Sequence, residues 1–95
     1  MKAVYQGMVI AQSGRTLLVE GTHYFPEQDV HMRYLEPSDF KSICPWKGEA
    51  SYYDVEIAGH RCLNAAWHYP HPKEQASHVR GHIAFWGEVN VIQDE

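Results

Sequence analysis

The sequence contains few cysteines and no metal-binding pair of them. Only Cys44 and Cys62 occur among 95 residues, too few for a disulfide framework. They are not spaced as CxxC, so the usual structural zinc site and the thioredoxin-type redox motif are both absent. We therefore expect two free thiols and a reducing, cytoplasmic setting.

Long apolar runs and an excess of basic residues are also missing. No apolar segment approaches the ~20 residues that cross a bilayer, and no apolar stretch typical of a secretory leader follows Lys2. Lys and Arg total 8 against 12 Asp and Glu, which gives a net charge of −4. Nucleic-acid binding by counterion release needs the opposite sign. We expect neither a membrane nor a nucleic-acid partner.

The composition is otherwise that of an ordinary folded protein, with 44% hydrophobic and 21% charged residues. The length is that of one domain, so we expect residues 1–95 to form a single one. Gly and Pro punctuate short segments rich in aliphatic and aromatic residues throughout the chain. This spacing is typical of antiparallel β structure and predicts a mainly β fold.

Several elements can be placed along the chain. A hairpin is predicted between 8–11 and 16–20, a turn at 36–39, and a brief strand at 42–44. Longer strands are predicted at 49–57 and 61–69, one short helix at 73–80, and a final pair of strands at 82–86 and 88–92. Alternation within 49–57 directs Tyr53, Val55 and Ile57 inward, and leaves Tyr52 on the solvent face.

The densest chemistry lies in the run CPWKG, residues 44–48. Trp46 offers a face for stacking or cation–π contact, and Lys47 offers a charge for an anion; alternatively, Trp46 fills the core and Lys47 points to water. Arg15 could clamp a carboxylate or phosphate at a hairpin mouth, or be a solvated turn residue. Trp67 and Tyr69 share a strand face beside two alanines, which suits either a cavity wall or an interlocked core.

Nucleophilic and metal chemistry are less well supported. Cys44 could be a nucleophile only with a base in reach and a lowered pKa, and an inert buried thiol is the alternative. His78 and His82 are four residues apart, but Gly81 lies between them and a third ligand would have to come from elsewhere. We therefore expect no metal site and no cofactor.

Together these fragments resemble the small bacterial family catalogued as domain of unknown function 427, over roughly residues 3–91. The resemblance is carried by the following runs: RTLLVEG (15–21), YFP (24–26), LEPSD (35–39), CPWKG (44–48), SYY (51–53), AAW (65–67), YP (69–70) and GHIAFW (81–86). It implies compact antiparallel coiled sheets of Mss4-like or β-tent-like barrel form, with one short helix.

The family is sometimes labelled a nucleotidyltransferase, but two-metal nucleotidyl transfer needs closely placed carboxylates. The Gly-Ser and Asp-x-Asp pattern that usually supplies them is absent. We therefore expect a domain that binds a small anionic ligand, with an enzyme acting on a nucleotide or phosphorylated substrate as the alternative and a protein-interaction module as the second alternative. The sequence leaves open whether any catalysis occurs. The expected cleft is lined by Tyr24, Trp46, Tyr53, Trp67 and Tyr69, with Arg15 and Lys47 as its anion contacts.

Overall fold

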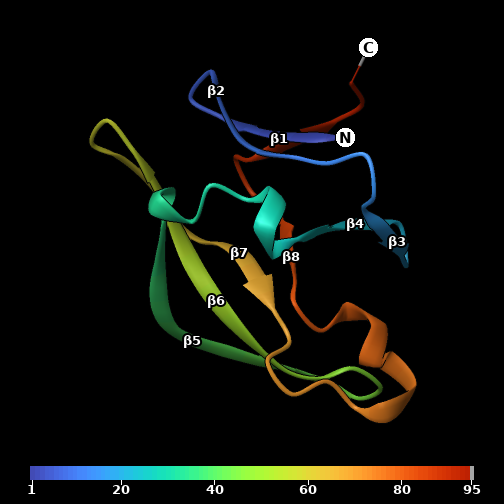
Figure 1. Cartoon of the computed structure of the whole chain (residues 1–95). Coiled ribbons are helices and arrows are strands. Elements are labelled where there is room, and N and C mark those ends of the chain that lie inside the picture. Colours follow the sequence, from blue (N-terminus) through green and yellow to red (C-terminus); the bar gives the residue numbers. More distant parts are fainter. Residues whose placement is uncertain (95) are drawn as a thin grey trace.

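Two antiparallel sheets make up the fold in the computed structural model, which describes residues 1–94 (Figure 1). The smaller sheet has the order β2 (Met8–Gln12), β1 (Lys2–Tyr5), β9 (Asn90–Ile92). The larger sheet has the order β3 (Leu17–Val19), β4 (Thr22–Pro26), β8 (His82–Phe85), β7 (His60–His68), β6 (Gly48–Ile57), β5 (Leu35–Cys44). The mainly β prediction is confirmed. The sheets do not close into a barrel over these residues, because β3 and β5 remain free edges of the larger sheet.

Two-residue turns set the strand pairing. Glu20 and Gly21 both have positive φ, at 53° and 78°, as type I′ hairpin turns require. They join β3 to β4, and turns of the same kind at 6–7 and 58–59 join β1 to β2 and β6 to β7. The predicted hairpin between 8–11 and 16–20 is therefore wrong. Both strands form, but β2 pairs with β1 and β3 pairs with β4.

The chain passes from the smaller sheet to the larger through Ser13. The Ser13 amide donates to the Met1 carbonyl at 3.0 Å, and its hydroxyl donates to Asp29 at 2.7 Å. The return passage follows β8, where Val89 is buried between the sheets. As a result β9 pairs with β1, and the predicted pairing of 82–86 with 88–92 is wrong.

Strand β5 is longer than the sequence predicts, since it runs through the supposed turn at 36–39. Its register on β6 shifts between Pro37 and Lys41, and there the Ser38 hydroxyl accepts a hydrogen bond from the Phe40 amide at 3.1 Å. An edge strand tolerates Pro37 because a proline has no N–H to contribute to a ladder. The polar residues that predicted a turn therefore form a β-bulge.

The helical segments are short pieces of 3₁₀-helix. They are η1 (Glu27–Asp29), η2 (Met32–Tyr34) and η3 (Glu74–Val79), and η3 stands where the sequence predicts the helix at 73–80. Non-helical angles at Ala76, with φ −120° and ψ 19°, break η3 into two short turns. Within residues 1–94 no helix has the length and apolar character to cross a membrane.

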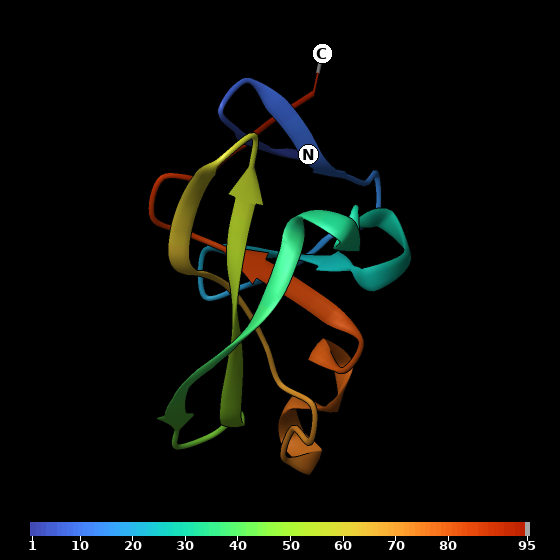
Figure 2. The same ribbon diagram turned by 90° about the vertical axis from the view of Figure 1, so that its left-hand side faces the viewer.

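The larger sheet buries apolar side chains on both faces. Phe25, Val55 and Phe85 point toward the smaller sheet and form an intersheet core with Ala3 and Ile10. The opposite face carries a second core, which η3 covers through Ala76 and Val79. Figure 2 shows the blue β1–β2 hairpin at one end of the molecule and the orange η3 segment at the other. The second core holds most of the predicted site.

Candidate functional site

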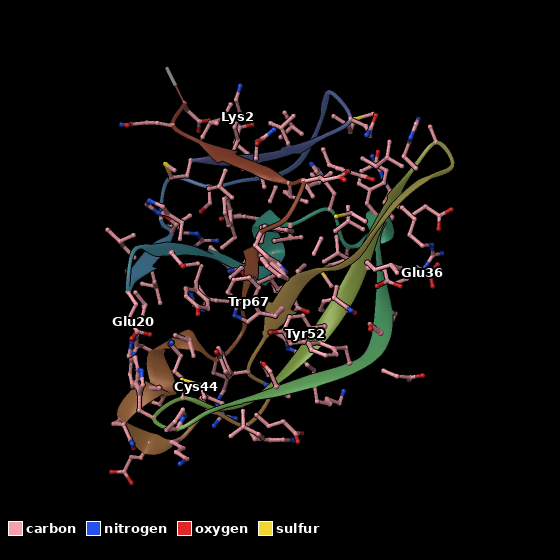
Figure 3. The ribbon with its side chains drawn as sticks, turned by 180° about the vertical axis from the view of Figure 1, so that it is seen from behind. Lys2, Glu20, Glu36, Cys44, Tyr52 and Trp67 are labelled. Carbon is pink, nitrogen blue, oxygen red and sulfur yellow. The ribbon has the colours of Figure 1, made fainter. Side chains whose placement is uncertain are left out.

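Five aromatic side chains gather on the η3 side of the larger sheet, and we call them the aromatic cluster: Tyr24, Trp46, Tyr52, Trp67 and Tyr69. The Trp67 ring centroid lies 6.2 Å from that of Tyr24, edge to face, and 6.2 Å from that of Tyr52. The edge-to-face geometry of the first pair is one of the arrangements that aromatic rings favour. Figure 3 shows Tyr52 and Trp67 in the interior, with Cys44 and Glu20 further toward one end of the molecule.

The ammonium of Lys47 lies against this cluster. Its side chain is 7% exposed, which is rare for a lysine unless its charge is paired. Nζ lies 4.7 Å from the Trp46 ring centroid and 5.8 Å from that of Tyr69, both within cation–π range. The ammonium also donates to the Cys44 Sγ at 3.8 Å and forms an ion pair with the Glu20 carboxylate.

The turn that carries Lys47 is held by the segment that follows β7. Lys73 donates its amide to the Lys47 carbonyl at 2.9 Å and its Nζ to the Pro45 carbonyl at 2.6 Å. Gly48 has φ +116°, and a Cβ there would lie 3.3 Å from the His71 carbonyl oxygen. Only glycine fits this backbone closely against the neighbouring loop. The local sequence thus places Lys47 rigidly.

Glu20 reaches Lys47 from the β3–β4 turn. Its side chain is 60% exposed, in contrast to the buried ammonium that it pairs with. The hydrogen bond from Lys47 holds the pKa of Glu20 below its usual range. Burial alone would lower the pKa of Lys47, but the hydrogen bond to Glu20 and nearby polar groups outweigh it and raise that pKa. Both partners are therefore charged at neutral pH.

Two hydroxyl groups, on Tyr69 and Tyr52, complete the polar part of the site. Burial raises the pKa of the Tyr69 phenol well above its ordinary value. The Tyr52 hydroxyl lies 2.9 Å from that of Ser42 and shares a hydrogen bond with it. The site therefore combines one buried cation, one exposed carboxylate and aromatic walls, an arrangement that can hold a negatively charged group.

The structure brings together five of the seven predicted site residues: Tyr24, Trp46, Lys47, Trp67 and Tyr69. Tyr53 lies on the other face of β6, where it packs against the intersheet core and stacks on His68 at 5.1 Å. Arg15 is 62% exposed and pairs with Asp29 at 3.2 Å. Since Arg15 precedes β3 and Glu20 follows it, the two ion pairs lie at opposite ends of that strand.

Two members of the site are not predicted from the sequence. Tyr52 is assigned to solvent by alternation, but both faces of the larger sheet carry a core, so Tyr52 joins the aromatic cluster. Glu20 contacts Lys47 across 27 residues of sequence, and no local pattern indicates such a pairing. Across residues 1–94 we find no enclosed cavity or surface pocket, and no group of three or more His, Cys, Asp or Glu side chains placed to hold a metal ion.

Comparison with known proteins supplies the family. A comparison with curated proteins finds no match. The family model described as "Domain of unknown function (DUF427)" matches residues 1–95. The match extends over both sheets and the aromatic cluster, and it agrees with the resemblance carried by the CPWKG run and its companions. The chain therefore belongs to the DUF427 family.

Proposed function

We propose that the domain binds a small anionic ligand at the Lys47 ammonium, in the position that the Glu20 carboxylate occupies. The observation that carries the proposal is the asymmetry of this ion pair. Lys47 is buried and fixed by its turn, whereas Glu20 is largely exposed on a two-residue hairpin turn. A carboxylate or phosphate from solution can therefore exchange with Glu20 without disturbing the walls formed by Trp46 and Tyr69.

The aromatic walls strengthen such a contact. Water is excluded from one side of the ammonium by the Trp46 and Tyr69 rings, and an ion pair in lower dielectric is stronger than in bulk water. Cys44 and Cys62 are both free thiols, which supports the cytoplasmic setting that we include in this proposal. An enzyme acting on a nucleotide or phosphorylated substrate is the alternative at this site, because the same ammonium would bind a phosphate.

The test compares anion binding by the native chain and two variants at constant ionic strength. The probes are acetate, benzoate and inorganic phosphate, followed by Trp fluorescence and calorimetry. Glu20→Gln removes the carboxylate that competes with the probe for Lys47. Because this carboxylate is tethered to the chain, it competes at a millimolar effective concentration, and its removal should tighten binding by roughly tenfold. Lys47→Met should abolish binding.

Arg15→Gln is the matched control, because it also removes one positive charge but lies at the far end of β3. It should leave anion binding unchanged. Equal weakening by Arg15→Gln and Lys47→Met would overturn the assignment, as would undiminished binding by Lys47→Met. Turnover of a nucleotide that is lost in Lys47→Met would instead favour the enzyme alternative.

A protein-interaction module is the second candidate, and a separate observation favours it. Phe40 is half exposed on the edge strand β5, with its ring centroid 4.8 Å from that of Tyr52. It extends the row of aromatic rings formed by Tyr52 and Trp67 to the rim of the sheet. Ile43 on the same strand is also exposed, and exposed apolar side chains gathered in one region favour a surface that docks another chain.

A further inference from the structure

The free edge of β5 is the longest among residues 1–94. The strand has ten residues, whereas the edge strands β2, β3 and β9 have five, three and three. In Figure 1, β5 forms the left-hand margin of the larger sheet, with no strand beyond it. An edge of this length presents backbone donors and acceptors to another strand.

Two large apolar side chains lie exposed on this strand. Phe40 is 50% exposed and Ile43 is 71% exposed. The Phe40 ring is held in place by Tyr52, so little side-chain entropy would be lost if a partner covered it. The edge therefore offers both a backbone template and a preorganised apolar anchor.

We propose that β5 pairs with β5 of a second copy of this chain, antiparallel and with the twofold axis at Phe40. In this register Asp39 faces Lys41 of the second copy, and Lys41 faces its Asp39. The same register sets Pro37 opposite Ile43 and brings the two Phe40 rings together. Opposite charges and aromatic pairs directly across two strands each stabilise the pairing.

The charges select this register over its neighbours. Side chains keep to their own faces only if the register shifts by two residues at a time. One such shift sets Asp39 opposite Asp39, and the other sets Lys41 opposite Lys41. Like charges directly opposite each other are destabilising. Edge charges, Pro37 and the β-bulge that follows it oppose pairing with most foreign strands, but in the proposed register the charges are matched.

The proposed axis lies within the β-bulge between Pro37 and Lys41. The Phe40 amide already donates to the Ser38 hydroxyl at 3.1 Å, so it needs no acceptor across the edge. Antiparallel strands alternate hydrogen-bonded and non-hydrogen-bonded pairs, and in the latter the Cα atoms approach to about 4.5 Å. If the twofold axis passes through a non-hydrogen-bonded pair of Phe40 residues, the Phe40 amide keeps its hydrogen bond to Ser38. The short Cα distance of such a pair also brings the two Phe40 rings into contact.

The first test measures the mass of the full chain by sedimentation over a range of concentrations. The native chain should show a concentration-dependent dimer. Lys41→Glu should raise the dissociation constant by about tenfold or more, since two attractive pairs become repulsive. Combining Asp39→Lys with Lys41→Glu should restore the dimer. Arg80→Glu, with the same change of charge on an exposed residue far from β5 in the sequence, should have no effect.

The second test uses disulfide cross-linking under mild oxidation. Phe40→Cys lies on the proposed axis and should form a covalent dimer, because its two copies approach within disulfide range. Ile43→Cys is at least as exposed, but its two copies would lie about 20 Å apart at 3.3 Å per residue. It should not cross-link to itself. A native chain that is monomeric at all concentrations, or equal cross-linking of both variants, would overturn the proposal.

Discussion

Replacing Lys47 separates the contribution of its charge from that of its aliphatic stem. The side chain is 7% exposed, so nearly all of it is removed from water. Lys47→Ala deletes three buried methylene groups, each worth about 0.8 kcal/mol. We therefore expect Lys47→Ala to lower the free energy of unfolding by about 2 kcal/mol, and by somewhat more if the neighbouring rings leave a cavity.

Lys47→Met keeps the stem and removes only the charge. Methionine has a similar length and fills irregular space well. The former partner Glu20 is 60% exposed, so water can solvate its carboxylate and no charge is left buried. We expect Lys47→Met to lie within about 1 kcal/mol of the native chain, because the lost ion pair is offset by the avoided desolvation of the ammonium.

Urea denaturation followed by far-UV circular dichroism and Trp fluorescence measures both variants. The melting temperature should be lower by about 10 °C in Lys47→Ala and by much less in Lys47→Met, because about 1 kcal/mol shifts the melting temperature of a domain of this size by several degrees. If both variants lost about 3 kcal/mol or more, the charge itself would be holding the fold together. Lys47 and Glu20 would then form a structural ion pair, and a ligand could not replace Glu20 without unfolding the domain.

Three further predictions concern stability and thiols. The hydrogen bond from Lys47 lowers the pKa of Glu20 in the folded chain. The stabilising effect of the Glu20 carboxylate is therefore present above its unfolded pKa and lost as the pH falls through the folded pKa. The difference in unfolding free energy between the native chain and Glu20→Gln should shrink below about pH 4, and a difference that stays constant down to pH 2 would contradict this prediction. Gly48→Ala should cost about 1–3 kcal/mol, because φ is +116° and the new Cβ meets the His71 carbonyl; Gly59→Ala, with open space around it, should cost less in the same denaturation assay. Titration of denatured, unreduced protein should find both Cys44 and Cys62 as free thiols, and a preparation with neither free would refute the expectation.

The sequence predicts the strands better than their partners. Alternation places Val55 and Ile57 in the core correctly, because β6 has one face turned to the smaller sheet. The pairing of β2 with β1 escapes prediction since its turn, Gln6-Gly7, lacks the Asn-Gly or Asp-Gly signature of type I′ turns. Which strands become neighbours depends on how the two sheets bury their apolar side chains against each other. The sequence of a single strand carries no information on that packing.

The candidate site is predictable in part for a similar reason. Trp46 and Lys47 are adjacent in a turn, and Trp67 and Tyr69 alternate onto one face, so local rules group each pair. The assembly of these pairs requires the larger sheet to form. The sequence does not indicate that Arg15 pairs with Asp29, because Asp29 lies in η1. The two residues come close only because the chain passes from the smaller sheet to the larger between β2 and β3.

The turn that carries Lys47 is held by contacts between residues far apart in the sequence, and these contacts determine when the site forms during folding. Lys47 pairs with Glu20 over 27 residues, and Lys73 binds the Pro45 carbonyl over 28. Hairpins with two-residue turns form within microseconds, whereas contacts this distant in sequence slow the overall rate. The surroundings of Lys47 are therefore completed only when the β3–β4 turn, the β5–β6 turn and the segment after β7 have come together. In a refolding experiment, the tryptophan fluorescence, to which Trp46 and Trp67 of the aromatic cluster contribute, should reach its native value in the final kinetic phase, after most of the β signal in circular dichroism has returned.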